Sequence, residues 1–152
     1  MDFTNLNKAY PKDPLPMPLI DRLVNATVGP PQISFLDAIQ GYHQIPLAPE
    51  DQEKKTFVTP TRNYHYKVMP FDLKNARSTY QRMMTKMFEP QLGKNIEVYI
   101  DDMVVKSKEV SDHVDDLKNI FETLRKHKLR LNTSKCSFRV GLEKFLGYMV
   151  TH

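Results

Sequence analysis

The sequence predicts an α+β fold, in which helices pack on one face of a mostly antiparallel sheet. Short apolar runs typical of strands alternate with two segments whose apolar residues recur at helical spacing, in the coarse order β-α-β-α-β. Two further strand-like segments, which predict a hairpin, follow the first core strand. A chain of 152 residues can bury one sizeable core, so we expect one domain or a part of a larger one.

Composition and charge narrow the class of protein. The chain is 40% hydrophobic and 26% charged, as in soluble globular domains, and its single cysteine excludes an intrachain disulfide. No apolar run approaches the ~18 residues of a membrane span, and the opening MDFTNLNKAY has no signal-peptide core. We therefore expect an intracellular protein without a membrane partner. It would lie either in a cytoplasmic particle or in the nucleus. Residues 54–94 carry nine Lys and Arg against two acidic residues, which fits a polyanion partner or a solvated basic face.

The first half of the chain is predicted to hold a short helix, a buried strand and a hairpin. A helix can follow the extended YPKDPLPMP, with Pro18 in its first turn, Gly29 as its stop, and inward side chains at Leu19, Leu23 and Val24. The run ISFLDA (residues 33–38) is typical of a buried strand that ends at Asp37. The segments TFVTP and NYHYKVM predict a hairpin with one face formed by Tyr64, Tyr66 and Val68.

Two amphipathic helices and two late strands complete the pattern. Asn75 is expected to cap the first helix and Pro90 to end it. Its apolar stripe, more typical of core packing than of a cofactor site, is Ala76, Tyr80, Met83, Met84, Met87 and Phe88. Ser111 is expected to cap the second helix, whose inward residues are Val114, Leu117, Ile120, Phe121 and Leu124. The runs LRLN and FLGYMV predict the late strands.

The stretch EVYIDDMVVKS (residues 97–107) predicts a hairpin with an unusual loop. Its two apolar strands, Val98–Ile100 and Met103–Val105, are joined only by Asp101 and Asp102. A two-residue loop normally uses Asn or Gly, because its backbone needs φ > 0, and two adjacent carboxylates repel each other. The loop is either a solvated acidic turn or a site where a divalent cation converts the repulsion into coordination.

A third carboxylate, Asp37, bears on this choice. It ends an apolar strand 64 residues before Asp101, where nothing local accounts for it. If that strand lies beside the acidic hairpin, three carboxylates meet at one edge of a sheet, and such a cluster is stable only when protonated or bound to metal. Hard oxygen ligands of this kind suit a pair of Mg²⁺ ions.

These motifs resemble those of a known family. YIDDMVV resembles the Tyr-x-Asp-Asp hairpin of reverse transcriptases, and SFLDAIQGYHQIPL resembles the strand with their first catalytic aspartate. KVMPFDLKNARSTYQRMM is similar to the nucleotide-contacting loop and helix, LRLNTSKCSF to the lysine-bearing turn, and KFLGYMV to the primer-grip hairpin. The opening DFTNLNKAYPKDPLPMPLID is similar to the fingers entry of gypsy-type LTR retrotransposon polymerases.

The resemblance covers essentially all 152 residues and implies a fold and its division. The fold would be a polymerase right-hand palm, a ferredoxin-like antiparallel sheet with helices on one face, plus part of the fingers. Residues 1–31 and 50–72 would belong mainly to the fingers. Residues 32–49 and 73–152 would belong mainly to the palm, which would end at the primer-grip region.

The resemblance also implies site residues, cofactors and partners. Asp37, Asp101 and Asp102 would be catalytic and would bind two Mg²⁺ ions, for which Mn²⁺ can substitute. The implied nucleotide contacts are the Ala38 carbonyl, Tyr42 as steric gate, Phe71 against the sugar, and Lys135 as proton donor or merely a solvated loop lysine. The implied template and primer contacts are Gln81, Tyr99, Met103 and Gly147. The partners would be an RNA or DNA template with primer, dNTP, and the rest of the retroelement polyprotein, including thumb and RNase H.

Several positions depart from the family pattern. Charged residues stand where it has glycine or other small residues, at Arg62, Asp72, Arg77 and Arg139. Asp72 would place a carboxylate beside the triphosphate, so we expect this fragment to be impaired or inactive in isolation. One alternative is a non-catalytic retroelement relic or a domesticated domain that binds nucleic acid or protein. A second alternative is a metal-dependent nuclease, which also needs clustered carboxylates. A nuclease would not explain why Tyr42 and Phe71 stand near the expected site. Four histidines are not spaced as metal ligands, and we expect them to be structural or surface residues: His43, His65, His113 and His127.

Overall fold

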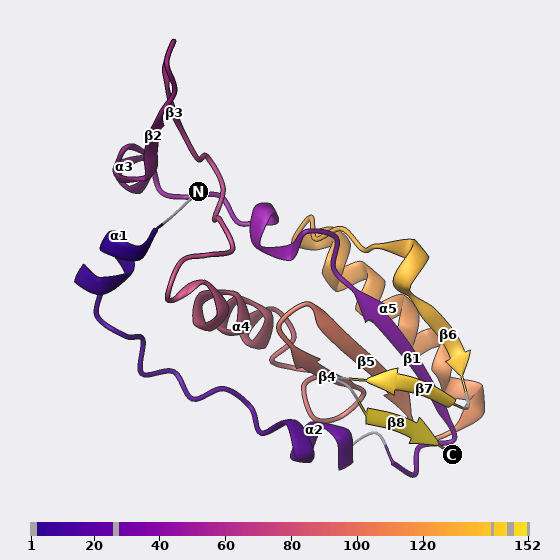
Figure 1. Ribbon diagram of the computed structural model, residues 1–152. Helices are drawn as coiled ribbons and strands as arrows, with labels where there is room; N and C mark the ends of the chain where they lie inside the picture. Colours follow the sequence, from indigo (N-terminus) through magenta and orange to yellow (C-terminus); the bar gives the residue numbers. More distant parts are fainter. Residues whose placement is uncertain (1–2, 26–27, 141, 146–147, 152) are drawn as a thin grey trace.

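The computed structural model describes residues 3–25, 28–140, 142–145 and 148–151. Its centre is a four-stranded antiparallel sheet in the order β4-β5-β1-β6 (Figure 1). The strands are β4 (Ile96–Tyr99), β5 (Asp102–Ser107), β1 (Gln32–Asp37) and β6 (Ser137–Val140). The central pair is in continuous register, which places Asp37 of β1 directly opposite Asp102 of β5.

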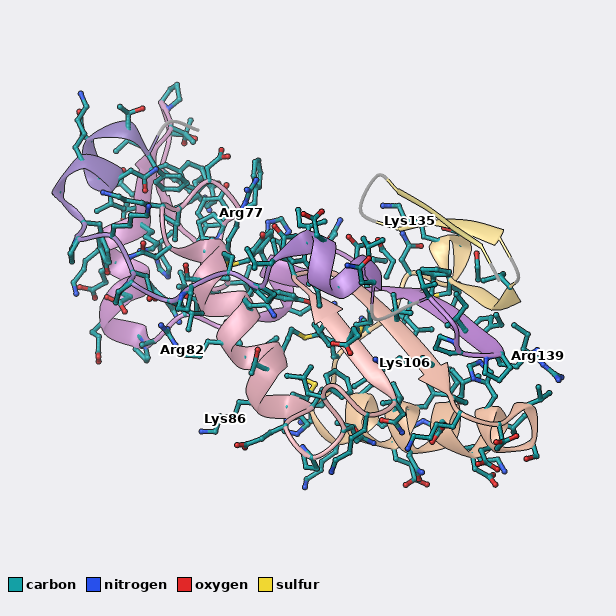
Figure 2. All side chains as sticks on the ribbon, turned by 90° about the horizontal axis from the view of Figure 1, so that it is seen from below. Arg77, Arg82, Lys86, Lys106, Lys135 and Arg139 are labelled. Atoms are coloured by element: carbon teal, nitrogen blue, oxygen red, sulfur yellow. The ribbon has the colours of Figure 1, made fainter. Side chains whose placement is uncertain are left out.

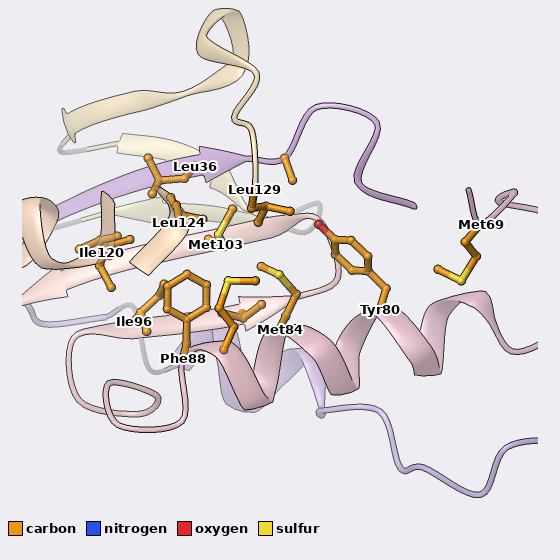
Figure 3. Close-up of a cluster of buried hydrophobic side chains, with 14 of the residues drawn as sticks. Leu36, Met69, Tyr80, Met84, Phe88, Ile96, Met103, Ile120, Leu124 and Leu129 are labelled. Carbon is orange, nitrogen blue, oxygen red and sulfur yellow. The ribbon is translucent and has the colours of Figure 1, made fainter. Parts of the chain in front are cut away.

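Two helices, α4 (Ala76–Met87) and α5 (His113–Lys126), pack on one face of this sheet and share a single core with it (Figure 3). The predicted α+β class is therefore confirmed. The fully or almost fully buried side chains of that core include Leu36, Tyr80, Met84, Phe88, Ile96, Met103, Ile120 and Leu124. Large apolar side chains of this kind contribute roughly 1.5–3 kcal/mol each when they leave water. The apolar stripe predicted from Ala76 to Phe88 forms the face of α4 that packs in this core, and Met83 is half-buried at the edge of that face.

The opposite face of the sheet has a smaller core. Successive side chains of a strand point to opposite faces, so Met103 and Val105 face the two helices while Val104 packs with Ile33 and Phe35. Leu23 of the short helix α2 (Ile20–Asn25) closes that second cluster. Both faces of β1 and β5 are thus covered, which explains why the two strands are apolar runs without alternation.

The remaining elements lie mainly before α4. They are α1 (Thr4–Ala9), the short 3₁₀ helix η1 (Gly41–Gln44), α3 (Pro49–Gln52), η2 (Glu53–Lys55), β2 (Thr56–Val58) and β3 (Asn63–His65). The predicted β2–β3 hairpin projects beyond the sheet (Figure 1), and Phe57 stacks on Tyr64 across it with ring centroids 5.7 Å apart. Tyr66 lies beyond the end of β3 and also packs on Phe57.

Both predicted side-chain caps are wrong. Asn75 stands at the start of α4, but its side chain accepts a hydrogen bond from the Asp13 backbone N–H (3.0 Å) and donates one to the Pro11 carbonyl (2.9 Å). It therefore ties the extended N-terminal segment to the helix. Ser111 lies inside a 3₁₀ turn, η3 (Val110–Asp112), and α5 begins only at His113. Its hydroxyl donates to Asp112 instead (3.0 Å).

Two side chains predicted to face inward are exposed. Leu19 lies just before α2 and is 74% exposed, and Val114 in the first turn of α5 is 49% exposed. Each belongs to the outer margin of an apolar stripe, where helical spacing alone does not separate core from surface.

The end of the chain departs most from the prediction. LRLN forms no strand, and Leu131 makes only an isolated bridge to Ala38. After η4 (Thr133–Lys135), the edge strand β6 forms where none was predicted. FLGYMV is divided between β7 (Leu142–Phe145) and β8 (Tyr148–Thr151), which pair with each other. In the part of the chain that the structure describes, no helix is long and apolar enough to cross a membrane.

Candidate active site

The acidic hairpin turns one residue earlier than predicted. Tyr99 pairs with Asp102, so the two-residue loop consists of Ile100 and Asp101, and Asp102 is already the first residue of β5. The left-handed residue is Ile100, at φ +53°. A β-branched residue in that region is an outlier that costs about 1–3 kcal/mol and persists only where surrounding contacts impose it.

Two neighbours impose this conformation. The buried Gln81 side chain of α4 accepts a hydrogen bond from the Ile100 N–H (2.8 Å) and donates one to the Val98 carbonyl (3.1 Å). The Ala38 N–H, one residue past β1, donates to the Asp101 carbonyl (3.1 Å). The turn is therefore braced from a helix and from the neighbouring strand, and is not a free solvated loop.

The three carboxylates lie at the same edge of the sheet. Asp37 ends β1 opposite Asp102, and Asp101 occupies the adjoining turn. Among the described residues, a cation that approaches them is Lys135, whose Nζ lies 3.7 Å from Asp37 Oδ2. The Lys135 side chain is 65% exposed, so this ion pair compensates little of the negative charge.

Burial and mutual repulsion disfavour the ionised carboxylates. Burial is the main cause that raises the pKa of Asp101, and the charges of Asp37 and Asp102 raise it further. Burial likewise raises the pKa of Asp102, with Asp37 as the next cause. The Tyr80 hydroxyl and the Lys135 ammonium act in the opposite direction on Asp101. The edge therefore favours whatever adds positive charge, either a proton or a cation.

The donor set fits a divalent cation in ligand type and in charge. Carboxylate oxygens are the ligands that Mg²⁺ and Mn²⁺ take, and Asp101 Oδ1 is buried without a hydrogen bond of good geometry among the described residues. Within those same residues, no group of three His, Cys, Asp or Glu side chains is already arranged around one point to hold a metal. The residues fit the ions, and the ligand shell is not preassembled.

A shallow cavity of about 190 Å³ adjoins Asp101. Its other lining residues are Gln40, Gly41, Tyr42, His43 and Phe71. Phe71 is 64% exposed and available to a ligand. Burial, and then the Asp101 charge, raise the pKa of Tyr42, while the Arg77 guanidinium opposes this rise. The cavity thus brings two predicted nucleotide contacts, Tyr42 and Phe71, to the acidic turn.

Two residues at this site were not predicted from the sequence. Gly41 lies so close to the turn that a Cβ there would overlap Asp101 Oδ1 and stand 2.6 Å from the Tyr80 hydroxyl oxygen. Tyr80, which lines the core in Figure 3, was predicted only as a core residue, yet its hydroxyl lies beside Asp101 at Gly41. One signal in the sequence could have found Gly41, since it is a glycine four residues after Asp37 in a chain with only 5 glycines.

The predicted template and primer contacts are not all accessible. Gln81 is 3% exposed and Met103 is fully buried, so both support the hairpin from below. Tyr99 is half-buried, and Gly147 lies outside the described residues. Ala38 is buried and holds the turn through its N–H.

The departing charged residues are scattered. Asp72 is exposed in the turn after Phe71 and is not part of the cavity lining, while its carbonyl accepts from Asn7 Nδ2 (2.9 Å). Arg139 has φ +53°, a conformation that glycine adopts without strain.

The basic residues of α4 lie on its outer side. In Figure 2, Arg82 and Lys86 project from the side of α4 away from the sheet. Arg82 donates to both carboxylate oxygens of Asp13 (2.8 Å each), so part of the basic region is neutralised internally.

Comparisons with known proteins agree with this geometry. The family model described as reverse transcriptase (RNA-dependent DNA polymerase) matches residues 1–150. The chain is 32% identical over 151 residues to the Retrovirus-related Pol polyprotein from transposon 297 of Drosophila melanogaster, and 34% identical over 152 residues to that from transposon gypsy of the same organism. Each match covers 99% of this chain, but only 14% and 15% of the respective polyprotein.

Solved structures show the same fold. The foamy viral protease-reverse transcriptase in complex with RNA/DNA hybrid superposes with a TM-score of 0.89 at 20% identity, covering 99% of this chain and 20% of that chain. A second structure of that viral protein, in complex with double-stranded DNA, gives a TM-score of 0.90 at 20% identity, with coverage of 99% and 26%.

Proposed function

We propose, since this chain belongs to the reverse transcriptase family, that it is the fingers–palm part of an RNA-directed DNA polymerase from an LTR retrotransposon polyprotein. The observation that carries the proposal is the meeting of Asp37, Asp101 and Asp102 at one sheet edge, beside a cavity walled by Tyr42 and Phe71. The nearby positive charge does not neutralise these carboxylates, and they adjoin an open cavity. Such a site suits nucleotidyl transfer assisted by divalent cations.

The three aspartates would hold the ions through their carboxylate oxygens. When bound, two Mg²⁺ ions, or Mn²⁺ in their place, supply the charge that activates a primer 3′-hydroxyl and neutralises the triphosphate. Tyr42 and Phe71 would border the incoming sugar, and the Ala38 carbonyl would lie on the nucleotide side. Lys135, whose Nζ lies 3.7 Å from Asp37 Oδ2, would donate a proton to the leaving pyrophosphate.

The same proposal assigns each part of the chain to the fingers or to the palm. Residues 1–31 and 50–72 would form mainly fingers, and residues 32–49 and 73–152 mainly palm, up to the primer grip. In this scheme Gln81 and Met103 act on the primer and template indirectly, by supporting the hairpin. Tyr99 and Gly147 would be direct contacts.

The partners would be an RNA or DNA template with its primer, and dNTP. Support comes from the structural neighbours, which hold an RNA/DNA hybrid and double-stranded DNA. The chain spans about one seventh of the length of its curated relatives, so the rest of the polyprotein, including thumb and RNase H, would complete the enzyme.

A primer-extension assay with Mg²⁺ or Mn²⁺ tests the proposal, on this chain and on a version extended at both ends. We expect the chain itself to extend poorly, because the Asp72 carboxylate would repel a triphosphate bound beside Phe71. In the version extended at both ends, Asp72→Gly should restore extension and strengthen nucleotide binding by about threefold or more. Asp101→Asn should abolish extension, because a neutral amide is a poor Mg²⁺ ligand.

Asp115→Asn is the matched control, since Asp115 is 75% exposed on α5 and pairs with Lys118 on the same helix. It should extend primers like the parent protein. Loss of extension in this control, or extension that survives Asp101→Asn, would contradict the proposed site. No extension by any version would favour the non-catalytic alternative, a domain that binds nucleic acid or protein.

A further inference from the structure

Tyr80 brings an unusual group to the catalytic edge. Its side chain is fully buried in α4, and its ring packs against Tyr42 with centroids 5.3 Å apart. Its hydroxyl has no hydrogen bond of good geometry among the described residues, and the same holds for Asp101 Oδ1. The two oxygens lie together beneath Gly41.

Two buried polar atoms without partners at one point are informative. Buried polar groups are nearly always hydrogen-bonded, because an unpaired one keeps the full cost of losing water. A carboxylate oxygen can only accept, whereas a phenol can donate. The Tyr80 hydroxyl and Asp101 Oδ1 are therefore chemically complementary, and they lie together beside Gly41.

We propose that Tyr80 is a positioning residue for Asp101, whose Oδ1 it binds by donating its hydroxyl hydrogen. This hydrogen bond fixes the carboxylate so that its second oxygen, Oδ2, faces the cavity lined by Tyr42 and Phe71. The consequence for bound divalent cations rests on the proposed function, but the contact itself does not.

The position of Gly41 supports this assignment. Its lack of a side chain leaves the space in which the hydroxyl and the carboxylate meet, since a Cβ there would overlap Asp101 Oδ1 and crowd the Tyr80 hydroxyl. Tyr42, the next residue, packs on the Tyr80 ring, so the residue proposed as steric gate also restrains the positioning residue. One group of side chains thereby links the nucleotide cavity to the carboxylate that would hold the ions.

The first test is a double-mutant cycle on unfolding midpoints, without metal. If the hydroxyl binds Asp101, Tyr80→Phe should lower the midpoint by about 2–4 °C, the shift expected when a chain of this size loses one hydrogen bond. In an Asp101→Ala background the same change should lower nothing, because the acceptor is gone. Tyr66→Phe, in the half-buried aromatic cluster next to the β2–β3 hairpin, is the matched control and should leave the midpoint unchanged.

A hydroxyl that only fills space gives the opposite result. Tyr80→Phe would then keep or raise the midpoint in both backgrounds, because an unpaired buried hydroxyl would be removed. That outcome would overturn the proposal.

The second test is the Mn²⁺ affinity of the same proteins, measured by calorimetric titration. Tyr80→Phe should weaken Mn²⁺ binding roughly tenfold while leaving the fold intact, as outer-shell partners of metal ligands do. Equal affinities in parent and variant would overturn the positioning role. If the parent binds no Mn²⁺, the proposed metal site fails, and the double-mutant cycle still decides whether Tyr80 holds Asp101.

Discussion

Ile100 explains why this chain can place two adjacent aspartates at a tight turn. The left-handed conformation that such a turn needs falls on Ile100, at φ +53°, so neither aspartate has to adopt it. Hydrogen bonds from Ile100 to Gln81 and from Ala38 to the Asp101 carbonyl hold the turn. Contacts with a helix and a strand thus offset the backbone strain at Ile100. Asp101 and Asp102 carry their carboxylates at the turn without adopting the strained conformation.

Gly41 gives a prediction at the same scale. Gly41→Ala should abolish metal-dependent activity and lower stability, because the added methyl group displaces the Asp101 carboxylate and crowds the Tyr80 hydroxyl. Gly93→Ala is the control. It has open space around it but a φ of +77°, so it should cost stability through backbone strain and leave activity intact. Equal activity losses in the two variants would show that the space at Gly41 is not needed.

At the scale of elements, a buried polar network joins α5 to the sheet. His113, at the first position of α5, is fully buried between the hydroxyls of Ser34 (2.7 Å) and Ser107 (2.8 Å). Ser107 donates its proton to Asp116 (2.6 Å), so it accepts from His113 Nδ1, and the Nε2 lone pair accepts from Ser34. The network therefore holds His113 neutral and fixes where α5 begins, which a capping rule based on Ser111 could not anticipate.

This network predicts a pH dependence of stability. Burial is the main cause that lowers the pKa of His113 below its ordinary value of 6.5; Arg139 adds to this, and Asp116 opposes it. The unfolded chain binds the proton more readily, so the contribution of His113 is present above about pH 6.5 and is lost as the pH falls toward the folded-state pKa. Urea unfolding at about pH 7.5 and 5.5 should show a larger loss in the parent than in His113→Gln. His127→Gln, at the far end of α5, should behave like the parent; equal losses in all three proteins would contradict the assignment.

At the scale of the whole molecule, the sequence sufficed for the fold class and for the pairing of the strand that ends in Asp37 with the acidic hairpin. Strands that end in Asp37 and begin at Asp102 are apolar on both faces, and such strands belong in the centre of a covered sheet. The family resemblance was equally visible, and the comparisons confirm it.

Other features depend on contacts that no local pattern encodes. The hairpin register is set by pairing of Tyr99 with Asp102, and a β-branched residue at positive φ is not expected from composition. β6 pairs with β1 only because the chain returns along that edge. The role of Gly41 depends on Tyr80 and Asp101, which are distant in sequence. Asn75 was correctly placed at a helix start, but its side chain binds the N-terminal segment across 62 residues of chain.

The most direct test of the proposed site is the anomalous diffraction of Mn²⁺ in crystals of this protein with primer, template and dNTP. Two Mn²⁺ peaks should lie within coordination distance of the Asp37 and Asp101 carboxylates, about 3.5–4 Å apart, with Asp102 beside them and the triphosphate toward Phe71. Asp101→Asn should remove both peaks or reduce their occupancy. Mn²⁺ bound only elsewhere on the protein, or a nucleotide bound with no ion at this edge, would contradict the proposed function.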